Sequence, residues 1–259
     1  MVFPNFQNKH AEDSMISPAD YLAYAKKTGQ GPKFKPPVAV IMCYSNRMKE
    51  HVLESHKTTQ VSFGAGEVYL MDDTGGRLAI IAGFGIGAPA AVTVLEEFIA
   101  LGVRKIMSIG SAGSLQKNIK VGDIVVCDKA IRDEGTSHHY IKRSKYAYAS
   151  KDLTGKAIQS LEKAGMKYTR GTSWTIDAPY RETIAEARHY QAEGILTVEM
   201  EASALFAVGK YRGVDVGAIF TISDSLAELE WKPKFHVNRT KKGLEIIADV
   251  AIDVLVNDA

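Results

Sequence analysis

Short apolar runs that alternate with helix-like segments are the feature that most constrains the fold of this chain. The runs 38–43 (VAVIMC), 105–110 (KIMSIG) and 123–131 (DIVVCDKAI) are largely apolar, as in strands that are buried on both faces. Segment 88–102, between the first two, has apolar residues at helical spacing and ends at a glycine. Strands buried in this way need helices on both faces of their sheet. The alternation therefore predicts an α/β fold.

Other segments extend the same alternation. Residues 67–85 contain two strands joined by a hairpin-type turn at 73–76 (DTGG). Segment 132–150 is polar and aromatic without a period, so we expect a long loop, and such loops are often functional. The remaining expected strands are 166–175, 197–201 and 214–225, and the remaining expected helices are 47–56, 153–165, 201–213 and 237–258.

The first 37 residues differ from the rest in composition. They are polar and contain five prolines. Ser17 followed by Pro18 predicts the start of a short helix, and 29–37 (GQGPKFKPP) is typical of a linker. We therefore divide the chain into an N-terminal extension, 1–37, and one main domain, 38–259.

Composition and charge exclude several classes of protein. The chain has 259 residues, of which 46% are hydrophobic, as in ordinary globular proteins. Its net charge of +2 argues against a dedicated nucleic-acid binder. We find no secretory signal and no apolar stretch of membrane-spanning length. Cys43 and Cys127 lie in apolar runs, as expected for buried free thiols. A cytoplasmic protein that binds neither nucleic acid nor membrane is predicted.

The glycine run 83–87 (GFGIG) follows one expected strand and precedes a helix. Its spacing is G-x-G-x-G rather than the G-x-G-x-x-G of dinucleotide-binding proteins, and no acidic residue follows about 20 positions later. A nicotinamide cofactor is therefore not expected. The run serves either a tight strand-to-helix turn or the lining of a small-molecule pocket.

Small and polar residues also end several other strands. In parallel sheets, ligands bind at such strand ends, where small residues let backbone N–H groups approach an anion. The stretch 197–201 (TVEME) places Glu199 and Glu201 around Met200. Because a buried unpaired carboxylate is costly, these acids either lie at the surface or serve a pocket. The strand ends that converge in this interpretation are 43–47, 83–87, 108–114, 197–201 and 221–225.

Five motifs together resemble a known family. They are GFGIGAPAA, SIGSAGSL, KVGDIVV, TVEMEASAL and FTISDS, in this order. The set is similar to the nucleoside phosphorylase family, which includes uridine phosphorylases, hexameric purine nucleoside phosphorylases and methylthioadenosine/adenosylhomocysteine nucleosidases. The resemblance covers about residues 38–256. It implies that 38–259 is a catalytic domain, folded as a three-layer α/β/α sandwich with a mixed, partly barrel-like central sheet.

The resemblance also implies roles for the acids. Glu201 corresponds to the carboxylate that binds the ribose hydroxyls, which are two adjacent donors that a carboxylate accepts well. Met200 would pack under the sugar, and Glu199 would serve the base or the structure. Asp224 corresponds to the acid that protonates the purine ring as the base leaves. Glu201 and Asp224 are therefore the candidate catalytic residues.

The phosphate side resembles the family less closely. Ser111 corresponds to the hydroxyl residue of the phosphate loop, beside the backbone of Gly110, and Arg47 to an arginine that contacts phosphate. However, the loop 42–47 (MCYSNR) lacks the usual proline and glycine, and Ser108 stands where phosphorylases often have arginine. One arginine neutralises a dianion poorly. Candidates to replace the missing charge are Lys57, Arg132 and Arg181.

The base remains open between purine and uracil. Residues 130–140 are similar to the substrate-side loop of uridine phosphorylases, but the glutamine–arginine pair that reads uracil has only Arg181 as a match. Asp224 favours a purine instead. Tyr180 or Trp174 are candidates to stack on the base, with core packing as the alternative.

We therefore predict phosphorolysis of a purine nucleoside or uridine to free base and (deoxy)ribose 1-phosphate. Phosphate is the co-substrate, no cofactor is needed, and adjacent His138 and His139 lack a third ligand for a metal. The family implies a homo-oligomer (dimer, trimer or hexamer) with its active site near a subunit interface. One alternative is a hydrolytic nucleosidase, although the loop has no acid before Glu50. The other is a non-catalytic nucleoside-binding protein, which would need neither Asp224 nor Arg47.

Overall fold

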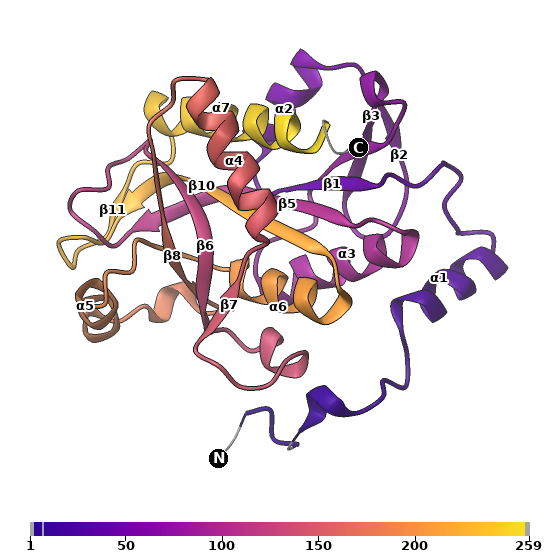
Figure 1. The fold of residues 1–259 in the computed structure, drawn as a ribbon, viewed down its shortest axis with the longest axis horizontal. Coiled ribbons are helices and arrows are strands. Elements are labelled where there is room, and N and C mark those ends of the chain that lie inside the picture. The colour runs from indigo at the N-terminus through magenta and orange to yellow at the C-terminus, as the bar shows by residue number, and fades with distance from the viewer. Residues whose placement is uncertain (1–2, 7, 257–259) are drawn as a thin grey trace.

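A mixed sheet forms the centre of the computed structural model, which describes residues 3–6 and 8–256 (Figure 1). Along its main path the strand order is β11-β10-β6-β8-β9-β5-β1-β4-β3-β2, and β7 pairs with β6. The strands are β1 Ala39–Cys43, β2 Thr58–Val61, β3 Glu67–Met71, β4 Leu78–Ala82, β5 Lys105–Ser114, β6 Ile124–Asp133, β7 Tyr146–Tyr148, β8 Tyr168–Ile176, β9 Thr197–Glu199, β10 Asp215–Ser225 and β11 Lys232–Pro233.

Part of this sheet closes on itself. Strand β10 pairs with both β5 and β6, β8 lies between β6 and β9, and β9 returns to β5. Strands β5, β10, β6, β8 and β9 therefore form a five-stranded barrel. Strands β1, β4, β3 and β2 extend from β5 as an open wing. The mixed, partly barrel-like sheet predicted above is confirmed.

Helices cover both faces of the sheet, as Figure 1 shows. Helices α2, α4 and α7 pack together on one side, and α3 packs with α6 on the other. The longer helices are α1 Pro18–Lys27, α2 Asn46–Ser55, α3 Ala88–Leu101, α4 Lys151–Lys163, α5 Ile184–Ala192, α6 Ala202–Arg212 and α7 Asn238–Val256. Short 3-10 turns are η1 Lys9–Ala11, η2 Asp72–Thr74, η3 Thr136–His139 and η4 Pro179–Arg181.

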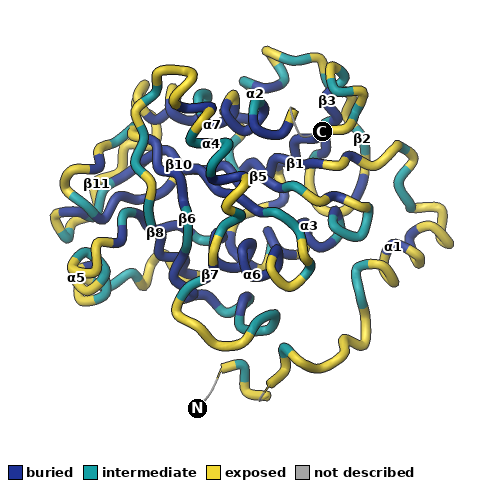
Figure 2. The backbone as a smooth tube through the Cα atoms, in the orientation of Figure 1, coloured by how far each residue is buried: buried dark blue, intermediate teal, exposed yellow. Residues whose placement is uncertain are grey.

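Strand β1 shows why the central runs are continuously apolar. Val40 and Met42 pack into the core on the side of α3 and α6. Ala39, Ile41 and Cys43 pack into the core on the side of α2, α4 and α7. Successive side chains of a strand point to opposite faces, so a strand between two helix layers needs apolar residues throughout. Figure 2 shows the central strands as the buried layer of the molecule.

The N-terminal helix α1 begins as predicted. The backbone N–H of Asp20 donates to the Ser17 side chain, and the Asp20 carboxylate accepts from the Ser17 N–H, with Pro18 in the first turn. Leu22 and Ala25 are the buried residues of α1, which packs on α3. The extension also contacts η3 of the main domain through η1 and Phe3, so more than one segment ties it down.

The structure corrects the expected secondary structure in three places. Segment 132–150 is not only a loop, because it contains η3 and β7, which pairs with β6. Strand β2 (TTQV) was missed because it is polar and only partly buried at the sheet edge. Helix α5 was missed because it buries a single residue, Ala187, and so lacks an apolar period.

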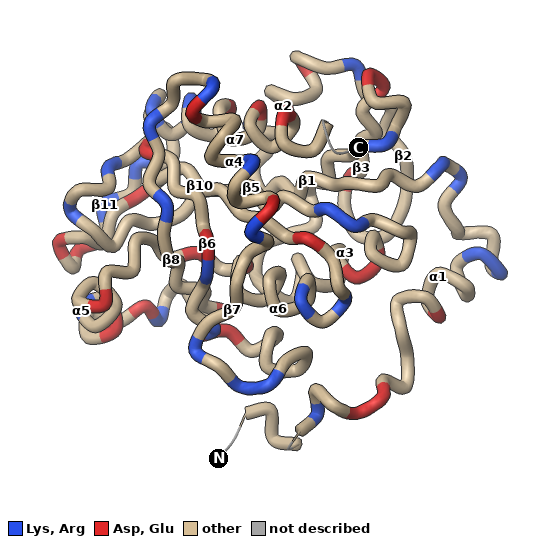
Figure 3. The backbone as a smooth tube through the Cα atoms, viewed as in Figure 1, with Lys and Arg blue, Asp and Glu red and all other residues tan. Residues whose placement is uncertain are grey.

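Two further features are the distribution of charge and the character of the helices. In Figure 3, lysine and arginine are interspersed with aspartate and glutamate along the backbone. Among the described residues, no helix is long and apolar enough to cross a membrane.

Candidate active site

Strand register brings the two candidate catalytic acids to one place. On β5, Gly113 pairs with Val198 of β9 and with Asp224 of β10. Glu201 follows β9 directly, so the TVEME and TISDS motifs lie on either side of the same stretch of β5. A Cβ on Gly113 would lie 3.0 Å from Asp224 Oδ2 and 3.1 Å from Val198 Cγ1. The small residue in the SIGSAGS motif therefore makes room for both neighbouring strands.

Glu201 is a buried carboxylate held by the end of the glycine run. Its Oε1 accepts a hydrogen bond of 2.6 Å from the backbone N–H of Gly87. Gly87 has a φ of 92°, a conformation that favours glycine. A Cβ on Gly87 would lie 3.9 Å from Met200 Cε, so Met200 lies beside the same carboxylate. Gly87 is also the N-cap of α3, so the run makes the strand-to-helix turn, and lining of a small-molecule pocket stays a prediction.

The electrostatics of Glu201 are unusual for a resting carboxylate. Burial raises its pKa to about 8, and the acids Glu199 and Asp177 add to the increase. Hydrogen bonds from the backbone of Gly87 and Met200 oppose the shift. The charges that act on Glu201 are therefore acidic, and a ligand that donates hydrogen bonds would relieve this carboxylate.

Glu199 has a structural role. It accepts hydrogen bonds from Ser173 Oγ and Thr175 Oγ1 of β8, at 3.2 and 2.5 Å. It also accepts from the backbone N–H groups of Glu201 and Ala202, at 2.8 and 2.7 Å. These two N–H groups lie at the start of α6, where the backbone N–H groups have no acceptor within the helix. Glu199 therefore anchors the turn that presents Glu201, and a contact with the base stays a prediction.

Asp224 is buried at the carboxyl end of β10. Ser223 Oγ donates to its Oδ1 at 2.7 Å, and Trp231 Nε1 donates to its Oδ2 at 3.0 Å. Burial nevertheless raises its pKa above the usual range of aspartate. Glu182 lies in the same environment, since burial and the charge of Asp224 raise the pKa of Glu182 to about 7. Two carboxyls that retain protons more readily than usual thus face this end of the site.

The predicted phosphate residues are only partly brought together. Gly110 and Ser111 lie on β5, where Gly110 is buried and Ser111 is exposed. Arg47 lies in the first turn of α2, and its guanidinium donates to Glu245 of α7 at 3.1 and 2.5 Å. Its contact with phosphate stays a prediction. Lys57 is exposed after α2.

Sequence reasoning missed Tyr44, which lies next to these residues. Its hydroxyl accepts a hydrogen bond of 3.3 Å from Ser108 Oγ. Its ring packs edge-to-face on Phe84, with centroids 5.2 Å apart. The absence of the usual glycine and proline from the loop 42–47 was the available signal.

The predicted base-side residues are dispersed. Tyr180 is 99% exposed and Arg181 is exposed, both in η4. Trp174 is fully buried and donates to Asp133 at 2.8 Å, so it belongs to the core. Arg132 is also buried, and it donates to the side chains of Ser137 and Ser144 and to the carbonyls of residues 141 and 142. Arg132 therefore holds its own loop in place.

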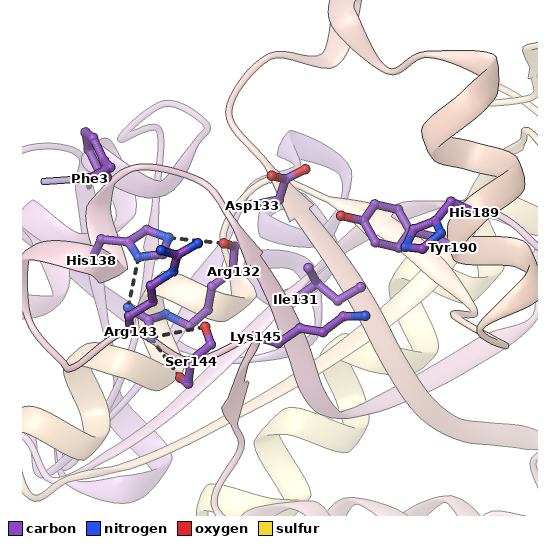
Figure 4. Close-up of a pocket in the computed structure, with 10 residues that line it drawn as sticks. All are labelled: Phe3, Ile131, Arg132, Asp133, His138, Arg143, Ser144, Lys145, His189 and Tyr190. Atoms are coloured by element: carbon purple, nitrogen blue, oxygen red, sulfur yellow. Dashed lines mark hydrogen bonds between the residues drawn. The ribbon is translucent and has the colours of Figure 1, made fainter. Parts of the chain in front are cut away.

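A separate open pocket of about 590 Å³ lies between this loop and α5 (Figure 4). Its lining includes neither Glu201 nor Asp224. Figure 4 shows Arg132 turned toward His138 and Ser144, and Lys145 pairs with Glu193 outside the lining. The pocket lining is Phe3, Ile131, Arg132, Asp133, His138, Arg143, Ser144, Lys145, His189 and Tyr190. Within the described part of the chain, no group of three or more His, Cys, Asp or Glu residues could hold a metal ion.

Comparison with known proteins identifies the family. The model of the phosphorylase superfamily matches residues 37–255. The chain belongs to the phosphorylase superfamily. It is 32% identical over 170 residues to a guanosine phosphorylase from Halorubrum lacusprofundi, which covers 61% of this chain and 70% of that protein. It is 32% identical over 178 residues to a DeoD-type purine nucleoside phosphorylase from Caldanaerobacter subterraneus subsp. tengcongensis, covering 66% and 77%.

Solved structures of this superfamily share the fold. A uridine phosphorylase from Vibrio fischeri superposes with a TM-score of 0.74 at 28% identity, covering 86% of this chain and 93% of that one. A purine nucleoside phosphorylase from Toxoplasma gondii, in complex with immucillin-H, has a TM-score of 0.77. At 19% identity, with 86% and 92% coverage, this second likeness concerns the fold alone.

Two further residues at the site carried no sequence signal. Trp231 lies seven positions after Asp224 and directly precedes the short strand β11. Only the pairing of β11 with β10 brings its side chain back to Asp224. Glu182 lies next to η4, and only folding brings it near Asp224. Neither spacing nor composition marks these residues, because their contacts depend on tertiary structure.

Proposed function

We propose that this protein is a nucleoside phosphorylase, a pentosyltransferase that transfers the pentose of a nucleoside to phosphate. The environment of Glu201 carries the proposal. This carboxylate is buried near other acids, accepts a hydrogen bond from the Gly87 N–H and lies beside Met200. The two adjacent hydroxyls of a ribose supply the donors that such a carboxylate lacks. A non-catalytic binder would have no need for a second buried acid at Asp224.

The chemistry follows from the positions of the two acids. Cleavage of the glycosidic bond builds positive charge on the sugar and negative charge on the departing base. Glu201 binds the sugar, and Asp224, whose pKa is raised by burial, donates a proton to the base. Phosphate, held by Ser111, the Gly110 backbone and Arg47, attacks the anomeric carbon and becomes pentose 1-phosphate.

We take purine nucleosides as the substrate class. A purine ring has a basic nitrogen that Asp224 can protonate, whereas uracil has no equivalent one. Arg132 is the arginine of the loop that resembles uridine phosphorylases. Its guanidinium donates hydrogen bonds to residues of that same loop, so it is not directed at a base. The guanosine and purine nucleoside phosphorylases among the relatives agree with this choice.

We further infer that the enzyme works in the cytoplasm as a homo-oligomer. In such an oligomer, a second subunit would cover the side chains of Tyr180 and Arg181, which are exposed in the single chain. Size-exclusion chromatography with light scattering tests this point, and a monomer at micromolar concentration would contradict it.

The decisive experiment uses the purified protein with inosine, guanosine, adenosine and uridine, each with and without inorganic phosphate. We expect free purine and pentose 1-phosphate only when phosphate is present. Base release at the same rate without phosphate would make the protein a nucleosidase. Binding of nucleosides without turnover in either condition would make it a binding protein.

A further inference from the structure

Tyr44 lies where strand β1 meets the middle of β5. Met42 pairs with Ser108, and Cys43 with Ile109, so the next residue of the chain, Tyr44, reaches Gly110. A Cβ on Gly110 would lie 3.3 Å from Tyr44 Cδ2, which shows that the aromatic ring packs against this glycine. Ser108 Oγ donates to the Tyr44 hydroxyl at 3.3 Å. The side chain therefore covers β5 from position 108 to position 110.

The ring is held on its other side as well. Phe84, from the glycine run that carries Gly87, packs against it with an interplanar angle of 70°. Burial raises the pKa of the Tyr44 hydroxyl well above the usual value of tyrosine, and the charges of Glu201 and Glu199 add to the increase. Tyr44 is therefore a neutral phenol beside the carboxylate that we assign to the sugar.

Cations are directed away from this place. Arg47, three residues after Tyr44, is paired with Glu245 of α7. Lys49, in the same helix, donates to Glu67 at 2.8 Å. A phosphate dianion that approaches Gly110 and Ser111 would thus contact the Tyr44 ring and the hydroxyls of Tyr44 and Ser108 first. The cationic side chains of Arg47 and Lys49 point to other partners. Neutral hydroxyls bind a phosphate dianion much less strongly than charged donors do.

We propose that Tyr44 is a specificity-determining gate on the nucleophile subsite: its ring occupies the space over Gly110, and inorganic phosphate binds only when the ring moves aside. This inference rests on the proposed function, because it concerns the co-substrate of the same site. The apparent affinity of a site that is open only part of the time falls in proportion to the open fraction. A ring that covers the subsite nine-tenths of the time weakens phosphate binding about tenfold.

Calorimetric titration with inorganic phosphate tests the gate without knowledge of the nucleoside. We expect Tyr44→Ala to tighten phosphate binding about tenfold. Tyr44→Phe keeps the ring and loses the bond to Ser108, so we expect a gain of about twofold to threefold. Tyr148→Ala, which removes a 65%-exposed tyrosine on β7, is the matched control and should leave the affinity unchanged.

A second arm adds charge to the opened site. In the double variant Tyr44→Ala/Ser108→Arg, the new guanidinium would occupy the space left by the Tyr44 side chain. It should tighten phosphate binding by about a further tenfold. Circular dichroism and melting temperature establish that each variant is folded. Phosphate affinities within twofold of the parent protein in Tyr44→Ala and in the double variant would overturn the proposal.

The base-release assay separates this inference from the proposed function. If the parent protein requires phosphate and Tyr44→Ala lowers the phosphate KM about tenfold, both stand. If the parent requires phosphate and Tyr44→Ala leaves that KM unchanged, only the gate is wrong. If the parent releases base and free pentose without phosphate while Tyr44→Ala forms pentose 1-phosphate when phosphate is added, the gate stands and the parent is a nucleosidase. If neither protein responds to phosphate, both proposals fail.

Discussion

The proposed sugar and base side of the site and the proposed nucleophile side are built in opposite ways. On the first side, Glu201 and Asp224 are buried acids, each held by hydrogen-bond donors from neighbouring segments. On the second side, Tyr44 packs over β5 and contacts Ser108 through its hydroxyl, while Arg47 pairs with Glu245. The first side matches the motifs of its superfamily, and the second side carries the departures from them.

This difference suits the structure to binding a nucleoside more than to binding phosphate. Buried acids with raised pKa values store unfavourable electrostatic energy that a nucleoside can relieve. The neutral hydroxyls of Tyr44 and Ser108 would bind a phosphate dianion only weakly, because they carry no positive charge. The proposed nucleoside site is therefore already formed in this structure, whereas the proposed phosphate site requires movement of Tyr44. The following predictions test the two sides separately, from the largest expected effect to the smallest.

Replacement of Asp224 tests the leaving-group end. We expect Asp224→Asn to lower kcat on purine nucleosides by about 10²–10⁴-fold, because an amide cannot supply the proton. Any activity on uridine should fall much less. Asp215→Asn, at the opposite end of the same strand, is the matched control and should retain activity. Equal losses on both bases would remove the acid role of Asp224.

Replacement of Glu201 tests the sugar end. We expect Glu201→Ala to lower kcat/KM at least tenfold on every nucleoside, because hydrogen bonds to a charged acceptor contribute about 1.5–3 kcal/mol each. The phosphate KM should change little, since the two sides of the site are built from different residues. Glu12→Ala, which removes an exposed glutamate of the N-terminal extension, serves as the control. Near-normal kinetics in Glu201→Ala would end the sugar-binding assignment.

Glu199 should affect stability more than substrate binding. We expect Glu199→Ala to lower the free energy of unfolding by about 2–4 kcal/mol, because it leaves buried hydroxyl and N–H donors without their acceptor. Denaturant unfolding measures this loss, and Glu12→Ala again gives the baseline for an exposed glutamate. A variant as stable as the parent, with a raised nucleoside KM, would instead assign Glu199 to the base.

The pKa of Glu201 predicts a pH-dependent stability. Its folded value of about 8 lies above the usual 4.5, so the stabilising contribution of the protonated form is complete below about pH 4.5 and is lost as the pH rises through about 8. Between about pH 6 and about pH 8 we expect the ligand-free protein to lose about 2 kcal/mol. Glu201→Gln should flatten this part of the profile. An identical pH dependence in the parent and Glu201→Gln would show that other groups cause it.

The Arg47–Glu245 pair should have the smallest effect. If Arg47 must leave Glu245 to reach phosphate, Glu245→Gln should lower the phosphate KM by about twofold to fivefold, in line with the strength of an exposed ion pair. Arg47→Ala should raise the phosphate KM by a similar factor. Lys156→Ala, which breaks an exposed pair with Asp152 on α4, is the control. Unchanged phosphate KM values in both variants would place phosphate elsewhere.

Much of the fold was accessible from local sequence patterns. The apolar residues of β1 predicted a buried strand, and Ser17 with Pro18 predicted the start of α1, because these signals depend on neighbours in the chain. Strand β2 and helix α5 escaped prediction because they bury few residues, so their periodicity is weak. Closure of the barrel came from the resemblance, since pairing of β5 with β9 and β10 joins distant segments.

The sequence by itself determined the order of the buried strands and of the helices with a clear apolar period, the superfamily motifs and the presence of acids at strand ends. Only the tertiary structure decided what those acids and their neighbours contact. Glu199 became an anchor for α6 and Trp174 a core residue, while Tyr44 came to lie over Gly110. The physical reason is that a hydrogen bond or a packed ring depends on distances of a few ångströms between segments far apart in the chain. Such distances are set by the packing of the whole domain rather than by any local pattern.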